Sequence, residues 1–159
     1  MKVKFLVEED FVNYKKPSMF IGFPTCTWKC EKECGIKGIC QNGPLANSPN
    51  IDISKEEIVK RYISNPISKA IVFGGLEPID QFVEVIEIID YFRKKGDNSP
   101  FVIYTGYYPN EIPNHINSLK NYNNIIVKFG RFLLNSPHRF DEVLGVELAS
   151  ENQYAEQIS

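Results

Sequence analysis

Residues 18–44 read SMFIGFPTCTWKCEKECGIKGICQNGP, and this stretch decides the fold because it joins a short apolar run to a loop that holds every cysteine of the chain. Cysteines that fill a core are scattered along a sequence, whereas these lie within fifteen residues of one another. The grouping therefore predicts a metal site. Thiolates are soft ligands that suit both zinc and iron–sulfur clusters. The four thiols are Cys26, Cys30, Cys34 and Cys40.

The intervals between the cysteines favour an iron–sulfur cluster over zinc. Three, three and five residues separate successive cysteines, and no CxxC pair occurs, whereas zinc sites with four cysteines usually combine two such pairs. A 4Fe-4S cluster that is held by three cysteines leaves one iron with an open coordination position, which a catalytic cluster needs. Two alternatives stay open: a non-catalytic four-cysteine zinc module that mediates protein contacts, and an electron carrier that uses all four thiols.

Length and composition indicate one domain with a real core. The chain has 159 residues, of which 43% are hydrophobic, and a net charge of −2. Acidic and basic residues are interspersed, so no basic surface predicts binding to nucleic acid. No apolar run approaches the ~20 residues of a membrane span, and the N-terminal sequence turns acidic at once, unlike a signal peptide. We therefore expect a cytoplasmic protein, in which grouped thiols bind metal rather than form disulfides.

Strand-like and helix-like runs alternate along the chain. The run KAIVFGG at residues 69–75 is nearly all apolar, as in a strand that is buried on both faces. Ser54 and Glu57 form a capping-box pattern that predicts the start of a helix. The other expected strands are residues 2–8, 18–23, 101–107 and 124–132, and the other helices are 80–95 and about 110–121, with one more short run at 142–150. This alternation predicts an α/β fold with a parallel sheet and right-handed crossovers.

Four unusual loops each follow one of the expected strands. They read FPTC, FGGLEP, YTGYY and KFGR. Because ligand sites in parallel α/β sheets form at the carboxyl ends of the strands, these loops are expected to converge. Glycine lets the backbone approach a ligand closely, so the pair Gly74 and Gly75 fits such a site, and it also fits an ordinary strand-to-helix turn.

Several of these motifs resemble those of radical S-adenosylmethionine (SAM) enzymes. The sequence from Cys26 to Cys30 resembles the first half of their CxxxCxxC motif, and FGGLEP resembles their GGE motif. YTGYYPNEI, KFGRF and ELASENQ resemble segments of the small activating enzymes of anaerobic ribonucleotide reductase, and the resemblance extends from about residue 17 to the C-terminus. It implies a single radical SAM domain over residues 1–159. The implied fold is a partial, open (β/α) barrel of parallel strands, with a cluster-binding loop at about 24–50.

The cysteine motif departs from the family pattern. No cysteine stands three positions after Cys30, and Cys34 comes one residue late. The CQN that begins at Cys40 resembles the cysteine–tyrosine–asparagine that closes the motif in the activating enzymes. The resemblance therefore favours Cys26, Cys30 and Cys40 as ligands, with residues 31–39 as an insertion that carries Cys34. The rival set uses Cys34 in place of Cys40.

A second departure lies in the FGGLEP loop, where Leu76 separates Gly75 from Glu77, although the family has the acid directly after the glycines. The resemblance implies that backbone groups of the two glycines contact the amine of SAM, and that Thr105 and Gly106 face its ribose or adenine. The two cations of KFGR could pair with the SAM carboxylate, fix an acid, or form a solvated surface pair. The implied cofactor-binding residues are Gly74, Gly75, Glu77, Thr105, Gly106, Lys128 and Arg131.

The function that the resemblance implies is reductive cleavage of SAM, with a 4Fe-4S cluster, to a 5′-deoxyadenosyl radical that installs a glycyl radical on anaerobic ribonucleoside-triphosphate reductase. Expected partners are this glycyl-radical enzyme and a flavodoxin- or ferredoxin-type reductant. The alternative within the same class is an enzyme that acts on a peptide or a nucleotide. No residue beyond those that bind the cluster and SAM is expected to be catalytic.

Overall fold

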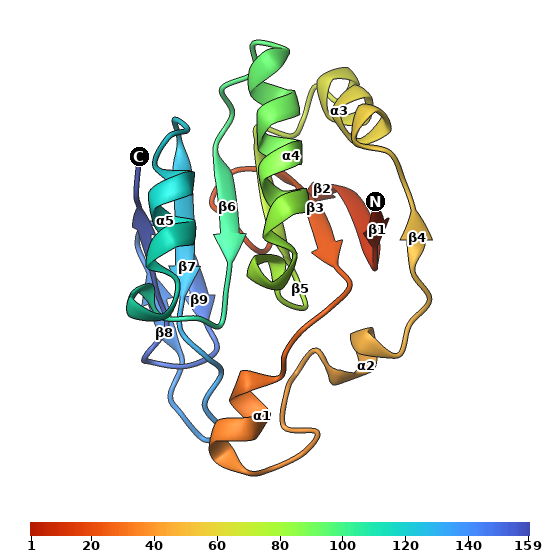
Figure 1. Ribbon diagram of the computed structural model, residues 1–159. Coiled ribbons are helices and arrows are strands. Elements are labelled where there is room, and N and C mark those ends of the chain that lie inside the picture. The colour runs from red at the N-terminus through yellow and green to blue at the C-terminus, as the bar shows by residue number, and fades with distance from the viewer.

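Strand β5 (Ala70–Gly75) lies near the middle of the main sheet, as its apolar sequence predicts (Figure 1). The computed structural model describes residues 1–159. The six strands of the sheet are arranged in the order β10–β7–β6–β5–β3–β2. The other five are β2 (Phe5–Asp10), β3 (Ser18–Phe23), β6 (Phe101–Tyr104), β7 (Ile125–Phe129) and β10 (Tyr154–Gln157).

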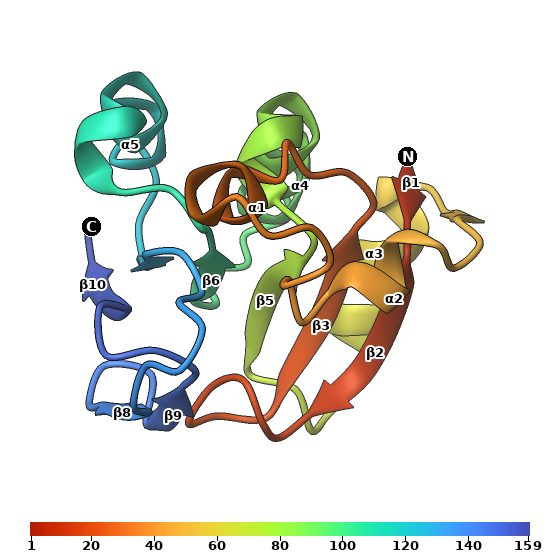
Figure 2. The same cartoon turned by 90° about the horizontal axis from the view of Figure 1, so that it is seen from below.

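Four strands of this sheet, β3, β5, β6 and β7, run parallel, and the edge strands β2 and β10 are antiparallel to their neighbours. The parallel strands follow one another in space in the same order as in the chain. Each crossover therefore moves one strand along in the same direction, which places the crossover helices on one face. Figures 1 and 2 show this face covered by α3 (Lys55–Ser64), α4 (Phe82–Lys94) and α5 (Pro113–Leu119).

Short elements complete the fold. Strand β1 pairs with β4, and β8 pairs with β9, both antiparallel. These elements are β1 (Lys2–Val3), α1 (Lys29–Cys34), α2 (Gly43–Ala46), β4 (Ile51–Asp52), β8 (Arg139–Asp141) and β9 (Val146–Leu148), with 3-10 turns η1 (Pro78–Gln81) and η2 (Pro109–Glu111). None of the helices combines the length and the apolar character that crossing a bilayer requires.

Both faces of β5 are buried, each in its own hydrophobic cluster. Ile71 and Phe73 belong to the larger cluster, which includes residues of α3 and α4. Ala70 and Val72 belong to the smaller cluster, together with Leu148 of β9. Successive side chains of a strand point to opposite faces, so this division follows from the period of two. The continuous apolar sequence of β5 is thus explained by burial on both sides.

The structure corrects the expected all-parallel sheet at both edges. The expected run 2–8 divides at Lys4, whose Nζ donates hydrogen bonds to the carbonyls of Ala46 (2.8 Å) and Ser48 (2.6 Å) at the end of α2. As a result, β1 pairs with β4 while β2 pairs with β3. Strand β10 was not expected, because its sequence YAEQ is only four residues long and contains no apolar run.

Within the short run expected at 142–150, only β9 is a strand. Gly145, with φ of 73°, turns the chain from β8 into β9, and its N–H donates to the carbonyl of Asp141 at 2.7 Å. The expected strands at 101–107 and 124–132 end three residues early, at Tyr104 and Phe129. The final residues of those runs form loops beyond the carboxyl ends of the strands.

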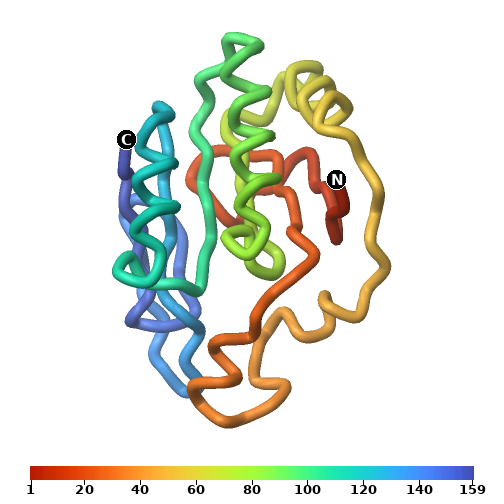
Figure 3. The backbone as a smooth tube through the Cα atoms, in the orientation of Figure 1, coloured from red at the N-terminus to blue at the C-terminus, as the bar shows by residue number.

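The chain between β3 and β5 makes a long excursion below the sheet (Figure 3). It leaves the carboxyl end of β3, passes through α1 and α2, and returns through β4 and α3. Figure 1 shows α1 and α2 in this region, beyond the carboxyl ends of the parallel strands. Residues 24–50, here called the cysteine loop, therefore lie where ligand sites of parallel sheets form.

Candidate metal centre

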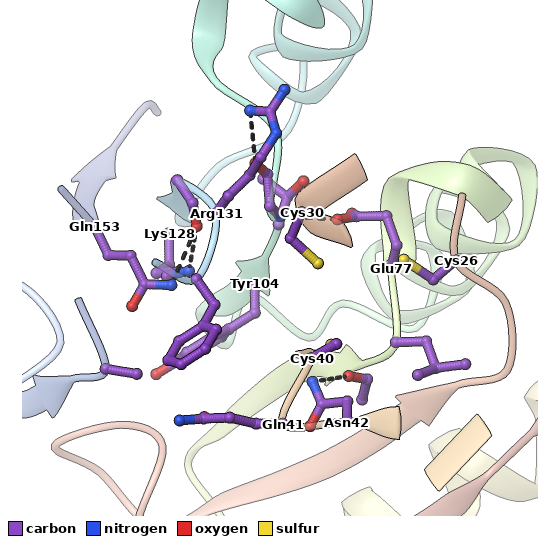
Figure 4. Close-up of a pocket in the computed structure, with 18 of the residues that line it drawn as sticks. Cys26, Cys30, Cys40, Gln41, Asn42, Glu77, Tyr104, Lys128, Arg131 and Gln153 are labelled. Carbon is purple, nitrogen blue, oxygen red and sulfur yellow. Dashed lines mark hydrogen bonds between the residues drawn. The ribbon is translucent and has the colours of Figure 1, made fainter. Parts of the chain in front are cut away.

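A cavity of about 410 Å³ opens at the carboxyl ends of the parallel strands. Its walls come from the cysteine loop, from the loops that follow β5, β6 and β7, and from β9. Figure 4 shows Cys26, Cys30 and Cys40 of the cysteine loop around the same space as Glu77 and Arg131. The four strand-end loops thus converge, as the sequence predicted.

The structure brings ten of the eleven predicted site residues to this cavity. The exception is Cys34, which is exposed and whose Sγ lies near the carbonyls of Glu31 (3.6 Å) and Ile36 (3.8 Å). The roles of the ten residues as ligands stay predictions. They are Cys26, Cys30, Cys40, Gly74, Gly75, Glu77, Thr105, Gly106, Lys128 and Arg131.

The three thiols at the cavity are free and partly buried. Burial raises the pKa of Cys26 to about 12, and burial together with the neighbouring Cys40 raises the pKa of Cys30 to about 11. The N–H of Trp28 donates to the Sγ of Cys26 at 3.2 Å. Cys26 and Cys30 are therefore protonated at neutral pH, and a metal centre that binds them must displace their protons.

The arrangement of the thiols fits an iron–sulfur cluster. No group of three or more His, Cys, Asp or Glu side chains lies close enough together to hold one metal ion, as a tetrahedral zinc site requires. A 4Fe-4S cluster presents a separate iron to each thiolate, and the three thiols Cys26, Cys30 and Cys40 border one cavity.

The arm of the cysteine loop that carries Cys26 is fixed by the loop that follows β5. The carbonyl of Thr25 accepts a hydrogen bond from the N–H of Glu77 at 2.8 Å. The carboxylate of Asp80 accepts from the N–H of Thr27 and from the hydroxyl of Tyr107, both at 2.6 Å. Sequence reasoning missed Asp80 and Tyr107, although both lie within three residues of predicted site residues.

The arm that carries Cys40 is fixed to the end of β5. The side-chain amide of Asn42 donates to the carbonyl of Gly75 at 2.7 Å. Gly75 has φ of 82°, and a Cβ at this position would lie 2.8 Å from the Cα of Gly22. Position 75 therefore requires glycine for both its backbone conformation and the close approach of β3.

Glu77 is 5% exposed and joins two of the strand-end loops. Its Oε1 accepts from the N–H of Ile79 at 3.1 Å, and its Oε2 accepts from the N–H of Gly106 at 2.8 Å. Burial raises the pKa of Glu77 to about 7, although these hydrogen bonds and one with Thr105 oppose the shift. Glu77 stands at the start of η1, where its carboxylate joins the chain after β5 to the chain after β6.

Lys128 and Arg131 are both buried, so the solvated surface pair that the sequence left open is wrong. The Nζ of Lys128 donates to the carbonyl of Gly130 at 2.8 Å, and burial lowers the pKa of Lys128 to about 7. Arg131 forms an ion pair with Glu111, and its Nη2 lies 2.8 Å from the carboxylate of Glu33. The Nε of Arg131 has no hydrogen-bond partner although it is buried beside the cavity.

The fold and the cavity define an α/β protein with a thiol-lined site at the carboxyl ends of its strands. Residues 19–153 match the family model described as a 4Fe-4S single cluster domain. The chain belongs to this family, which supports a 4Fe-4S cluster as its metal centre. No curated protein and no solved structure matches the chain.

Proposed function

We propose that the protein is a radical SAM enzyme, in which Cys26, Cys30 and Cys40 hold the 4Fe-4S cluster. The observation that carries the proposal is that these thiols share one cavity with Gly74, Gly75 and the other predicted cofactor-binding residues. Membership of a single-cluster family supports the cluster. A set of three ligands leaves one iron without a protein thiolate, and that iron is the position at which a substrate can bind.

The cavity also offers groups that suit SAM. The buried amine of Lys128 and the unpartnered Nε–H of Arg131 border the space, and both can donate hydrogen bonds to a carboxylate. The edge-to-face pair of Phe5 and Phe20, with ring centroids 5.0 Å apart, gives part of the wall an apolar surface for a nucleoside. These residues bind, orient and exclude water. The chemistry that a bound 4Fe-4S cluster supplies is one-electron reduction of the sulfonium of SAM.

The proposed fold type is a partial, open (β/α) barrel. Four consecutive parallel strands with their helices on one face support it. The antiparallel strands β2 and β10 end the sheet on both sides, so the barrel stays open. A site at the carboxyl ends of the strands is the usual position in such folds.

The proposed substrate is a glycine Cα–H of a glycyl-radical enzyme, most simply the anaerobic ribonucleoside-triphosphate reductase. One electron from a flavodoxin- or ferredoxin-type protein and one SAM give methionine and the 5′-deoxyadenosyl radical. This radical takes the hydrogen atom and leaves as 5′-deoxyadenosine. The cavity opens at the carboxyl ends of the strands, where a loop of a protein partner can enter it.

The proposal is tested by anaerobic reconstitution with iron and sulfide, reduction with dithionite and addition of SAM. We expect slow formation of methionine and 5′-deoxyadenosine in equal amounts, and faster formation with a glycyl-radical partner. The Cys40→Ala variant is the matched control and is expected to form none. A protein that assembles its cluster but neither binds nor cleaves SAM would be an electron carrier, and the proposal would then be wrong.

A further inference from the structure

Helix α1 carries Cys30 but contributes no residue to the hydrophobic core. It has six residues, none of them buried, and it begins after Trp28, whose φ of 57° is in the left-handed region. No side chain caps its N-terminus. Such a short helix is unstable by itself, so polar contacts must hold it in place.

Two charged side chains of α1 provide those contacts. Lys29 and Glu33 are four residues apart and therefore lie on one face of the helix. The Nζ of Lys29 lies 2.9 Å from the Oε1 of Glu111, and the Oε1 of Glu33 lies 2.8 Å from the Nη2 of Arg131. Cys30 stands between these two residues in the sequence, and Figure 4 shows Arg131 on the same side of the cavity as Cys30.

The other ends of these ion pairs are themselves fixed. Arg131 and Glu111 pair with each other, and Arg131 is 3% exposed. The guanidinium of Arg131 also donates to the carbonyl of Gly106 at 3.3 Å and lies 4.9 Å from the ring centroid of Tyr108. The N–H of Tyr108 donates to Glu111 at 2.8 Å. Arg131 and Glu111 are thus held in place by several contacts, beyond the carboxyl ends of β7 and β6.

We infer that Arg131 and Glu111 are positioning residues for the iron–sulfur centre, which act through Glu33 and Lys29 to hold α1 and its thiol Cys30 at the cavity. The inference rests on the cluster-binding part of the proposed function and is independent of SAM cleavage. It also gives the insertion at residues 31–39 a role, because Glu33 belongs to it. Residues that orient metal ligands affect affinity about tenfold or more when they are replaced.

The test compares two isosteric variants of the full chain, Glu33→Gln and Glu31→Gln, after anaerobic reconstitution. Both remove one negative charge from α1, but only Glu33 contacts Arg131. Glu31 accepts a hydrogen bond from the N–H of Gly38, which glutamine can keep. The readouts are the rate of iron release to a chelator and the reduction potential of the loaded protein, followed by electron paramagnetic resonance.

We expect Glu33→Gln to release iron about tenfold faster and to shift the potential, while Glu31→Gln changes the release rate less than about twofold. A merely structural role would lower the melting temperature and leave the potential of the loaded fraction unchanged. Equal effects of the two variants would show that charge near the cluster matters and position does not, and that result would overturn the inference. The inference would also be overturned if Glu33→Gln changed neither the rate of iron release nor the reduction potential.

A second variant tests whether Glu33 acts on iron release through Arg131. Arg131→Lys keeps the charge but cannot reach Glu111, Glu33 and the carbonyl of Gly106 together. It is expected to release iron at least as fast as Glu33→Gln, and the double variant no faster than Arg131→Lys alone. Additive effects would contradict a shared path. If the wild type forms no 5′-deoxyadenosine but these differences persist, the SAM proposal fails and this inference stands.

Discussion

Strand β5 and the cysteine loop are held in place by opposite means. Both faces of β5 are covered by apolar side chains, and its cluster on the helix side contains 21 buried residues. Helices α1 and α2 of the cysteine loop have no buried residue, and polar contacts attach the loop, among them those of Asn42, Lys29 and Glu33. The molecule therefore separates the residues that determine its stability from those that shape its metal site.

The largest effect is expected within the cysteine loop itself. Replacement of Cys40 by alanine removes a proposed ligand and should abolish the cluster's visible absorbance after reconstitution. Cys34→Ala should keep the absorbance, because Cys34 is exposed and does not line the cavity. Iron and sulfide analysis checks both variants. Loss of the cluster in Cys34→Ala with retention in Cys40→Ala would support the rival ligand set.

In the core, Phe73→Ala is expected to lower the free energy of unfolding by about 3–5 kcal/mol, since Phe73 is fully buried. The matched change in the cysteine loop, Ile36→Ala, should cost less than about 0.5 kcal/mol because Ile36 is half exposed. Urea denaturation of the metal-free protein measures both. If the two variants lowered the free energy of unfolding by similar amounts, the cysteine loop would contribute to the core as β5 does. That result would contradict the difference between the two regions.

Glu77 lies between the two regions, and its titration should appear in the stability of the metal-free protein. Its pKa is about 7 in the folded protein and 4.5 as the reference value, so the folded state binds more protons between these values. The free energy of unfolding should therefore fall as pH rises from 4.5 to 7, by up to roughly 3 kcal/mol.

The Glu77→Gln variant should flatten this decline, because an amide does not titrate. Urea denaturation at several pH values between 4.5 and 7 makes the comparison. Glu111, whose pKa is lowered to about 2 by hydrogen bonds from Arg131, Tyr108 and Lys29 despite partial burial, titrates below this window. Lys128, whose pKa burial lowers to about 7, titrates at its upper edge. If the free energy of unfolding of the variant fell with pH as steeply as that of the wild type, groups other than Glu77 would cause the decline.

The smallest change in stability is expected at Asn42, whose amide donates to the carbonyl of Gly75. Asn42→Ala should cost about 1 kcal/mol or less, because the residue is exposed. It should nevertheless speed the release of iron, since it frees the arm that carries Cys40. Asn47→Ala, an exposed change in the same loop, is the control and should leave the rate unchanged.

The sequence predicted the regular part of the fold because that part depends on local apolar pattern. Strand β3 has the predicted bounds of Ser18–Phe23, and β5 begins one residue later than predicted. The edge strand β10 could not be predicted, because its pairing with β7 depends on tertiary contacts and not on its own composition. Helix α1 was missed because it is short and starts from an unusual backbone conformation at Trp28.

The candidate site was predictable where glycines and cysteines mark it, and less so where it depends on pairing. The cysteines and Gly75 could be selected from the sequence, and the structure brings them to one cavity. Asp80 and Glu111 could not, since an acidic residue after a strand has many possible partners. Their contacts with Thr27 and Arg131 arise only when the loops converge.

The long first crossover has a consequence for the order of folding. The crossovers from β5 to β6 and from β6 to β7 each contain little more than one helix, whereas β3 and β5 are separated by residues 24–69. Closing a longer loop costs more chain entropy, so contacts between distant segments form later. We therefore expect β5, β6 and β7 to assemble first and β3 to join them afterwards. The cysteine loop, which is part of this long crossover, would then become ordered only after β5, β6 and β7 have assembled.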